Sequence, residues 1–138
     1  MSLNALIAYY ESLTEESVVR LPAFYAEDAT FTDPFNDVRG VPAIQRIFRH
    51  MFRQVETPRF VVLEKVADAD GAVLVWAFHF RFRRSGPEQV IQGVSHLKFD
   101  DDGRVNFHRD YWDAASELYL KLPGISLLLR LLRRKLAA

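Results

Sequence analysis

Four segments with strand character follow one another in the second half of the chain, and they constrain the fold more than any other feature. Short turn signals rich in Asp, Gly, Ser and Pro separate these segments. Strands joined by turns this short pair with antiparallel neighbours. The sequence therefore predicts an antiparallel meander built from residues 60–67, 72–83, 89–99 and 104–112.

Helical patterns come before the meander. Apolar residues recur at helical spacing in 3–13 and in 41–55, and Thr14 to Ser17 offers N-cap chemistry for a second helix from Val18 to about Tyr25. A short strand is expected at 29–33, followed by a loop. Helices followed by a run of strands are typical of an α+β fold, with the helices packed on one face of a curved sheet. A length of 138 residues fits one domain.

The last segment, residues 118–138, differs from the rest. After Pro123 and Gly124, the run ISLLLRLLRRKL places an apolar stripe on one side of a helix and arginines on the other. A basic amphipathic helix can cap the cavity of its own domain, pair with a partner chain, or lie on an anionic membrane surface. The membrane alternative depends on Arg130, Arg133, Arg134 and Lys135. We expect a domain over 1–117 and this extension beyond it.

Charge and composition exclude several classes of function. The chain has 18 basic and 18 acidic residues, so it has no overall positive charge for nucleic acid, and we expect no such partner. Five of the basic residues and none of the acidic ones follow Glu117, which leaves the body mildly acidic and the tail basic. The absence of cysteine excludes disulfides and thiolate nucleophiles.

Motif searches predict neither a cofactor nor a metal. The four histidines lack HxH or HExxH spacing, and no glycine-rich phosphate-binding motif occurs. The N-terminus does not resemble a secretory signal, and no apolar run is long enough to span a bilayer. We therefore expect a cytoplasmic protein, with contact to the inner membrane surface as the alternative that the basic tail leaves open.

The stretch VNFHRDYWD, residues 105–113, gives the strongest functional signal. Alternation along a strand puts His108, Asp110 and Trp112 on one face. This face is a plausible pocket floor. A second stripe, on a preceding strand, consists of Trp76, Phe78, Phe80 and Phe82, and because the arginines alternate to the other side, it favours a hydrophobic interior over nucleic-acid stacking. The alternative is an edge strand whose polar residues face solvent.

The run FYAEDATFTDPFNDVRGVPAIQRIF, together with SHLKFDDDGRV and HRDYWD, resembles the nuclear transport factor 2-like superfamily. Within it, the chain is similar to the ketosteroid isomerase and SnoaL-like polyketide cyclase branch, over about residues 3–117. The resemblance implies a cone-shaped fold with a pocket under the curved sheet. It also turns His108, Asp110, Trp112 and the aromatic stripe inward. The fold hosts enzymes, binding modules and transport factors alike.

The resemblance also implies site residues. Asp33 matches the general base of the steroid isomerases, and Tyr9 matches their oxyanion-hole tyrosine, with Tyr10 as its competitor for the inward position. Ser95 stands where those enzymes hold a protonated aspartic acid, so the isomerase site is incomplete. Asp110 falls on a pocket strand that carries acid/base carboxylates in polyketide cyclases and epoxide hydrolases.

Each of these residues also has a structural interpretation. Asp33 suits a turn before Pro34, Asp110 an ion pair with a local arginine, and His108 a core histidine bonded to a carboxylate. In the functional interpretation, Asp33 and Asp110 form an acid/base pair, and His108 relays a proton between them. A carboxylate in an apolar cavity is a useful base because desolvation disfavours its charged form.

Three functions remain open from the sequence. The first is a cofactor-independent isomerase, cyclase or dehydratase that acts on an apolar steroid-, polyketide- or lipid-like molecule. The second is a non-catalytic carrier or sensor of such a ligand, docked on a membrane or partner through its basic tail. The third is a structural homodimer, because the outer sheet face often forms a dimer interface in this fold.

Overall fold

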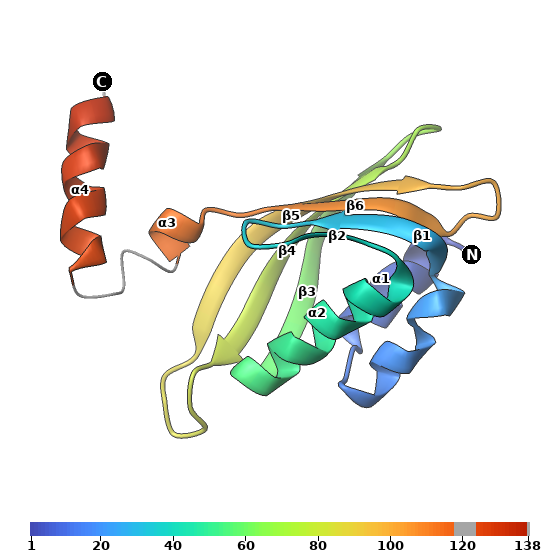
Figure 1. The fold of residues 1–138 in the computed structure, drawn as a ribbon, viewed down its shortest axis with the longest axis horizontal. Helices are drawn as coiled ribbons and strands as arrows, with labels where there is room; N and C mark the ends of the chain where they lie inside the picture. The colour runs from blue at the N-terminus through green and yellow to red at the C-terminus, as the bar shows by residue number, and fades with distance from the viewer. Residues whose placement is uncertain (118–123, 138) are drawn as a thin grey trace.

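The computed structural model describes residues 1–117 and 124–137. The N-terminal helices pack under a curved sheet, and the C-terminal helices lie beyond its end (Figure 1). The N-terminal part contains α1 (Leu3–Glu11), the 3-10 helix η1 (Glu16–Ala23), β1 (Tyr25–Thr32), β2 (Asp37–Arg39) and α2 (Val41–Gln54). The C-terminal part contains β3 (Glu56–Ala67), β4 (Ala72–Arg81), β5 (Gln89–Phe99), β6 (Val105–Tyr111), α3 (Ala114–Glu117) and α4 (Ile125–Leu136). The α+β class is as the sequence predicts.

The six strands form one sheet in the order β2-β1-β6-β5-β4-β3. The predicted meander is confirmed, because β3, β4, β5 and β6 pair antiparallel in sequence order. The strand β1 pairs in parallel with β6 and antiparallel with β2. The β1–β6 pairing brings the N-terminal part of the chain beside the strand that carries His108 and Asp110.

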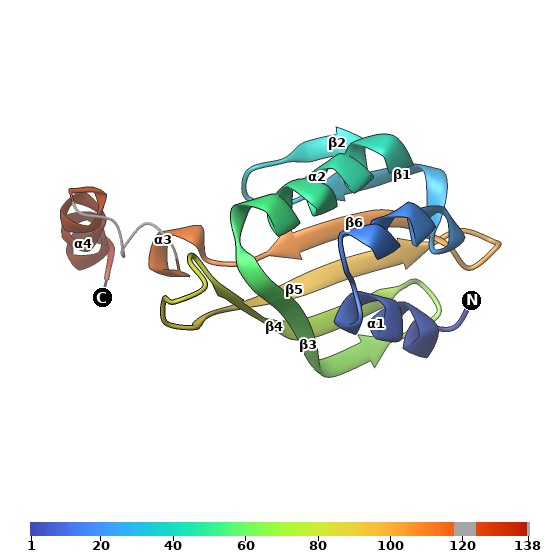
Figure 2. The ribbon, with the colours of Figure 1, turned by 90° about the horizontal axis from the view of Figure 1, so that it is seen from below.

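The N-terminal helices cover one face of the sheet (Figure 2). Their apolar sides meet the inward residues of the strands in a core of fully buried side chains. The largest of these are Leu6, Leu21, Tyr25, Ile44, Leu74 and Leu97. The helix α2 begins where Gly40 adopts φ +95° and Pro42 occupies the first turn, which fixes the direction in which α2 crosses the sheet.

Three local predictions differ from the structure. The second helix is a 3-10 helix that ends at Ala23 because Pro22 lacks the N–H that a longer α-helix needs, and Tyr25 opens β1 instead. The predicted loop after Pro34 contains the short strand β2. The strand β3 begins at Glu56, before Pro58, where a shift in its register with β4 accommodates the proline.

The predicted basic amphipathic helix is present as α4, whose large apolar side chains are mostly exposed. Residues 118–123, where we place the end of the domain, lie outside the described residues, so the boundary at 117 remains a prediction. Among the described helices, none has the length and apolar character needed to cross a membrane.

Candidate functional site

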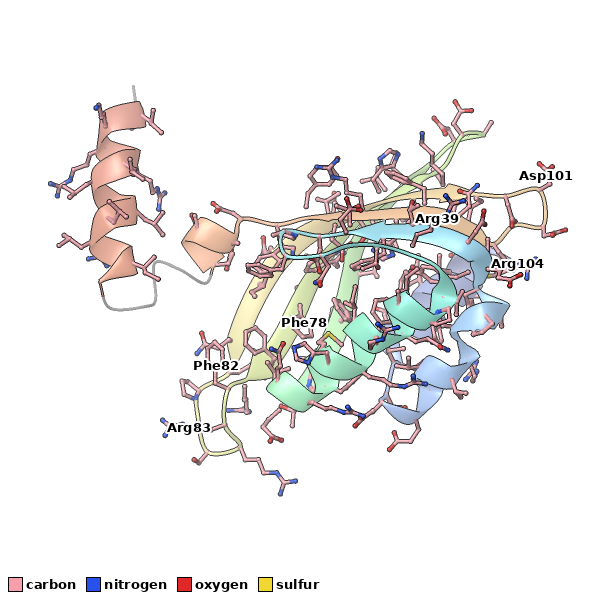
Figure 3. All side chains as sticks on the ribbon, in the orientation of Figure 1. Arg39, Phe78, Phe82, Arg83, Asp101 and Arg104 are labelled. Carbon is pink, nitrogen blue, oxygen red and sulfur yellow. The ribbon has the colours of Figure 1, made fainter. Side chains whose placement is uncertain are left out.

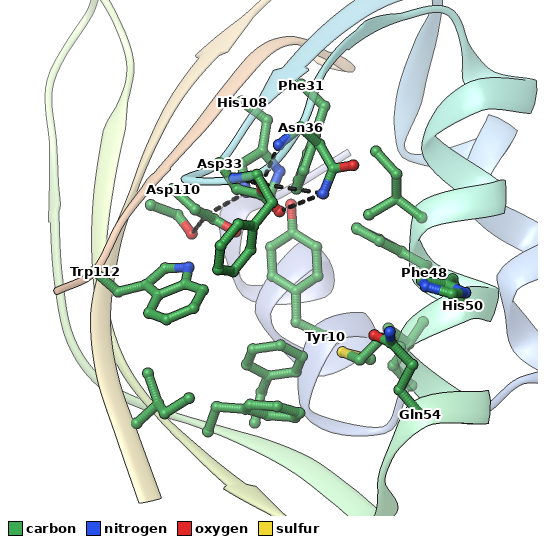
Figure 4. A pocket seen from close by; sticks show the side chains of 18 of the residues that line it. Tyr10, Phe31, Asp33, Asn36, Phe48, His50, Gln54, His108, Asp110 and Trp112 are labelled. Atoms are coloured by element: carbon green, nitrogen blue, oxygen red, sulfur yellow. Dashed lines mark hydrogen bonds and ion pairs between the residues drawn. The ribbon is translucent and has the colours of Figure 1, made fainter. Parts of the chain in front are cut away.

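A cavity of about 1020 Å³ lies between α2 and the concave face of the sheet (Figure 4). Both predicted stripes line it, so the prediction of which strand faces point inward is confirmed. Phe80 is buried, whereas Phe82 is 52% exposed at the rim. The predicted site residues that line the cavity are Asp33, Trp76, Phe78, Phe80, Phe82, Ser95, His108, Asp110 and Trp112.

Two tyrosines and a histidine form a buried series of hydrogen bonds at the cavity wall. The hydroxyl of Tyr10, on α1, lies 2.5 Å from that of Tyr25. The Tyr25 hydroxyl lies 2.6 Å from Nδ1 of His108, and the two rings are stacked. These two hydrogen bonds thus join the first helix to the first and last strands of the fold.

The series of hydrogen bonds continues through His108 to the cavity floor. The Nε2 atom of His108 lies 2.6 Å from Oδ1 of Asp110, and the Ser95 hydroxyl donates to the same oxygen at 2.5 Å. The indole Nε1 of Trp76 donates to Ser95 Oγ at 2.9 Å. Six side chains from α1, β1, β4, β5 and β6 therefore form one connected polar network at the cavity wall.

The donor inventory sets the direction of every bond for an ionised Asp110 and a neutral His108. An indole N–H can only donate, so the Ser95 hydroxyl oxygen accepts from Trp76, and the Ser95 hydroxyl donates its hydrogen bond to Asp110. His108 is then the neutral tautomer with its proton on Nε2, which leaves Nδ1 to accept from Tyr25. Every buried hydrogen in the network has an acceptor, which holds the imidazole and the carboxylate in one orientation.

The second carboxylate oxygen of Asp110 is the open end of the network. Among the described residues, Oδ2 of Asp110 has no hydrogen-bond partner, and the Asp110 side chain is 18% exposed where that of His108 is 5%. The carboxylate is thus anchored through one oxygen and accessible from the cavity through the other. This arrangement suits a group that exchanges a proton with a bound molecule.

Asp33 lines the same cavity, but its hydrogen bonds are separate from the network of Asp110. Its Oδ1 accepts from the backbone N–H of Phe35 at 2.8 Å and of Asn36 at 2.7 Å, and the Asn36 amide donates to both carboxylate oxygens. These bonds form the turn after β1, as the structural interpretation expected. The expectation that His108 relays a proton between the two aspartates is wrong, because its ring nitrogens are bonded to Tyr25 and Asp110.

Tyr9 points away from the cavity. Its hydroxyl donates to the carbonyl of Ser17 at 3.0 Å, and its ring stacks on Phe24. The prediction that Tyr9 faces the ligand is therefore wrong, and its neighbour Tyr10 has the inward position. One residue along α1 rotates a side chain by about 100°, so only one of the two adjacent tyrosines faces the cavity.

The comparison with family models decides the family. A model of the SnoaL-like domain matches residues 6–108. The chain belongs to the SnoaL-like family. No curated protein matches the chain significantly.

Solved structures with the same fold as this SnoaL-like chain include proteins that are distant from it in sequence. A protein from Catenulispora acidiphila with a ketosteroid isomerase-like fold, solved with trimethylamine, has a TM-score of 0.71 and 14% identity over 84% of this chain and 88% of that one. A proposed SnoaL-like polyketide cyclase from Jannaschia sp. CCS1 has a TM-score of 0.72 and 13% identity over 83% and 86%. TsrD from Streptomyces laurentii has a TM-score of 0.69 and 19% identity over 88% and 92%.

Tyr25 is the residue of the SnoaL-like site that the sequence analysis missed. Its side chain is buried, and burial, together with the neighbouring Tyr10 and Asp110 groups, raises the pKa of Tyr25 well above 10.0. Burial also raises the pKa of Tyr10 far above that value. Both phenols therefore stay protonated as hydrogen-bond donors. The sequence carries no signal for Tyr25, because its position depends on the irregular parallel pairing of β1 with β6.

The two buried phenols predict a loss of stability at alkaline pH. A phenol whose pKa is raised by folding stabilises the protein fully below 10.0, its ordinary value, and the stabilisation is lost as pH rises above that value, because the unfolded chain ionises first. We expect Tyr25→Phe to lower the melting temperature at neutral pH, since His108 and Tyr10 lose a partner, and to make the alkaline decline shallower. Melting curves from neutral to strongly alkaline pH check this, and an unchanged alkaline slope would contradict it.

Proposed function

We propose that this SnoaL-like chain is a cofactor-independent acid/base enzyme that moves a proton next to a carbonyl of an apolar small molecule. Isomerisation, dehydration and cyclisation are the reactions of this type. The observation that supports this proposal is the position of the Asp110 carboxylate. One of its oxygens is held by His108 and Ser95, and the other is open to the cavity.

Asp110 is the general base in this proposal. Its Oδ2 removes a proton from the carbon beside the substrate carbonyl and returns it at another position of the same molecule, so no external acid, oxidant or cofactor is consumed. His108 and Ser95 are positioning residues, because they hold Oδ1 and thereby aim Oδ2. Tyr25 and Tyr10 fix the His108 tautomer from behind.

A donor is available for the substrate oxygen. Trp112 lines the cavity beside Asp110, with its indole nitrogen turned toward the polar floor (Figure 4). Its Nε1–H has no hydrogen-bond partner among the described residues. An indole N–H aimed at the oxygen stabilises the negative charge that develops when Asp110 removes the proton. The sequence analysis assigned Trp112 only as a wall.

The walls favour a flat apolar molecule. Phe60, Phe78 and Phe80 form a stacked series, with ring centroids 4.6 and 5.1 Å apart. Such a surface takes the face of a fused or conjugated ring system by dispersion and hydrophobic contact. A cavity of about 1020 Å³ lies at the upper end of the usual range for small-molecule sites. Steroid-, polyketide- and lipid-like carbonyl compounds are therefore the substrate class.

The two tryptophans of the chain provide the test. Trp76 and Trp112 are the only tryptophans, and both line the cavity, so their fluorescence reports occupancy directly. We expect apolar cyclic ketones to change this fluorescence saturably and to be converted in the same samples, as followed by chromatography and mass spectrometry. The variant Trp112→Phe keeps Trp76 as the one reporter and, because it removes the proposed donor, should still bind the ketone but convert it more slowly.

Two outcomes would contradict the proposal. Saturable binding without conversion of any ketone or epoxide in the panel would leave the non-catalytic binding module as the function. No change in fluorescence with any apolar ligand would contradict both the enzyme and the binding module.

A further inference from the structure

Several of the described basic side chains lie at the end of the domain where the cavity opens. Arg46 and Arg49 of α2 line the cavity rim without an ion-pair partner among the described residues. Arg83 and Arg84 lie in the adjacent β4–β5 turn, where Arg84 approaches Glu56 at 3.7 Å. The chain leaves the sheet beside Trp112 at the same end and continues to α4 (Figure 1).

The opposite end of the domain is acidic. The β3–β4 and β5–β6 turns lie there, far from the rim, as the positions of Asp101 and Arg83 show (Figure 3). These turns contain Asp68, Asp70, Asp100, Asp101 and Asp102, against one basic residue, Arg104. Although the net charge is zero, positive charge lies around the cavity opening and negative charge lies at the far end. We call this separation the charge axis.

The helix α4 adds both charge and apolar surface to the chain. Arg130, Arg133 and Arg134 lie on one side of the helix, which contains no acidic residue. The apolar side chains with large exposure are Ile125, Leu127, Leu128, Leu131, Leu132 and Leu136, between 46% and 83% exposed. A helix of about 18 Å with these two faces needs a partner that is both apolar and anionic.

Aromatic side chains at the rim give a second, independent observation. Phe82 is exposed directly beside Arg83 and Arg84, and Phe35 is exposed where its ring meets Trp112. Exposed aromatic rings next to arginines are typical of loops that enter the headgroup region of a membrane. The rim therefore has the same combination of apolar and basic groups as α4.

Two observations argue against the other occupants of the α4 face. In the structure α4 stands away from the cavity with its leucines exposed, so it does not cap the cavity of its own domain (Figure 1). Pairing of two α4 helices would bring together eight cationic side chains, four from each helix, and like charges at short range repel. An anionic bilayer supplies hydrocarbon for the leucines and negative headgroups for the arginines at once.

We propose that the rim end of the domain binds an anionic membrane surface, with α4 lying in the interface and the cavity opening toward the bilayer. The apolar ligand then passes between the lipid and the cavity without crossing water. This interaction does not depend on the proposed acid/base function, because it requires only the charge axis, the rim aromatics and α4.

Vesicle co-sedimentation with the full chain tests the proposal. We expect binding to phosphatidylcholine vesicles that contain phosphatidylglycerol, weak binding to phosphatidylcholine alone, and loss of binding as salt rises. The triple variant Arg130→Gln, Arg133→Gln, Arg134→Gln should lower the partition coefficient about 5-fold per residue, or about 100-fold in total. The double variant Leu128→Ala, Leu132→Ala should also weaken binding.

A matched control removes the same charge elsewhere. Arg39, Lys65 and Lys98 are exposed and do not line the cavity, and their combined replacement by glutamine should leave binding nearly unchanged. No binding of the intact chain, equal binding to neutral vesicles, or an equal loss in the control would each overturn the proposal. So would a dimer in sedimentation velocity that the α4 variants abolish while vesicles are not bound.

Discussion

Replacing Asp110 with asparagine is expected to lower turnover by about 10²- to 10⁴-fold, while ligand affinity and folding stay nearly unchanged. The amide keeps the shape of the carboxylate, and its oxygen still accepts from Ser95 and His108, so the network that connects β5 and β6 is retained. What is lost is the basic oxygen that faces the cavity. The measurement is kcat for a ketone that binds, with the dissociation constant taken from tryptophan fluorescence.

Two aspartate variants serve as controls for this prediction. Asp28→Asn changes an exposed carboxylate on the outer surface that pairs with Arg39, and it should leave kcat unchanged. Asp33→Asn should retain most activity, because the asparagine oxygen still accepts the backbone N–H groups of Phe35 and Asn36. Abolished turnover in Asp33→Asn together with normal turnover in Asp110→Asn would assign the base to Asp33 instead.

Gly93→Ala is expected to destabilise the fold by about 1–3 kcal/mol and to disturb the cavity. Gly93 on β5 lies opposite Trp76 on β4, and a methyl group there would stand 2.4 Å from the Trp76 ring. The indole must then shift, and its bond to Ser95 is strained or broken. Chemical denaturation measures the loss in the free energy of unfolding, and ligand titration measures the disturbance of the site.

A second substitution tests the cause of this loss. Trp76→Phe shortens the ring, so in the Gly93→Ala background it should relieve the clash, and the double variant should be more stable than the sum of the two single effects. Strictly additive effects would show that Trp76 is not the group that the new methyl group displaces.

The sheet could be predicted from the sequence because its signals are local. Strand alternation put His108, Asp110 and Trp112 on one face, and the hairpin turns set the antiparallel order of β3 to β6. Helical periodicity likewise identified α2 and α4. The ends of η1 and β1 could not be predicted, because Pro22 and tertiary packing decide where the helix stops.

The polar network was only partly predictable. The pairing of His108 with Asp110 follows from their spacing on one strand, whereas the bond from Tyr25 to His108 joins residues far apart in the chain. The choice between Tyr9 and Tyr10 depends on the rotation of α1 about its axis, which the stacking of Tyr9 on Phe24 determines. Such tertiary contacts leave no pattern in the sequence.

The most direct test of the proposed function is deuterium uptake. A ketone that saturates the tryptophan signal is incubated in D₂O with the wild-type chain or with Asp110→Asn, and the hydrogens on the carbon beside the carbonyl are followed by NMR. The proposed mechanism predicts rapid exchange with the wild-type chain and exchange near the uncatalysed rate with Asp110→Asn at equal occupancy. Exchange at the same rate with both proteins would contradict a proton-transfer role for Asp110.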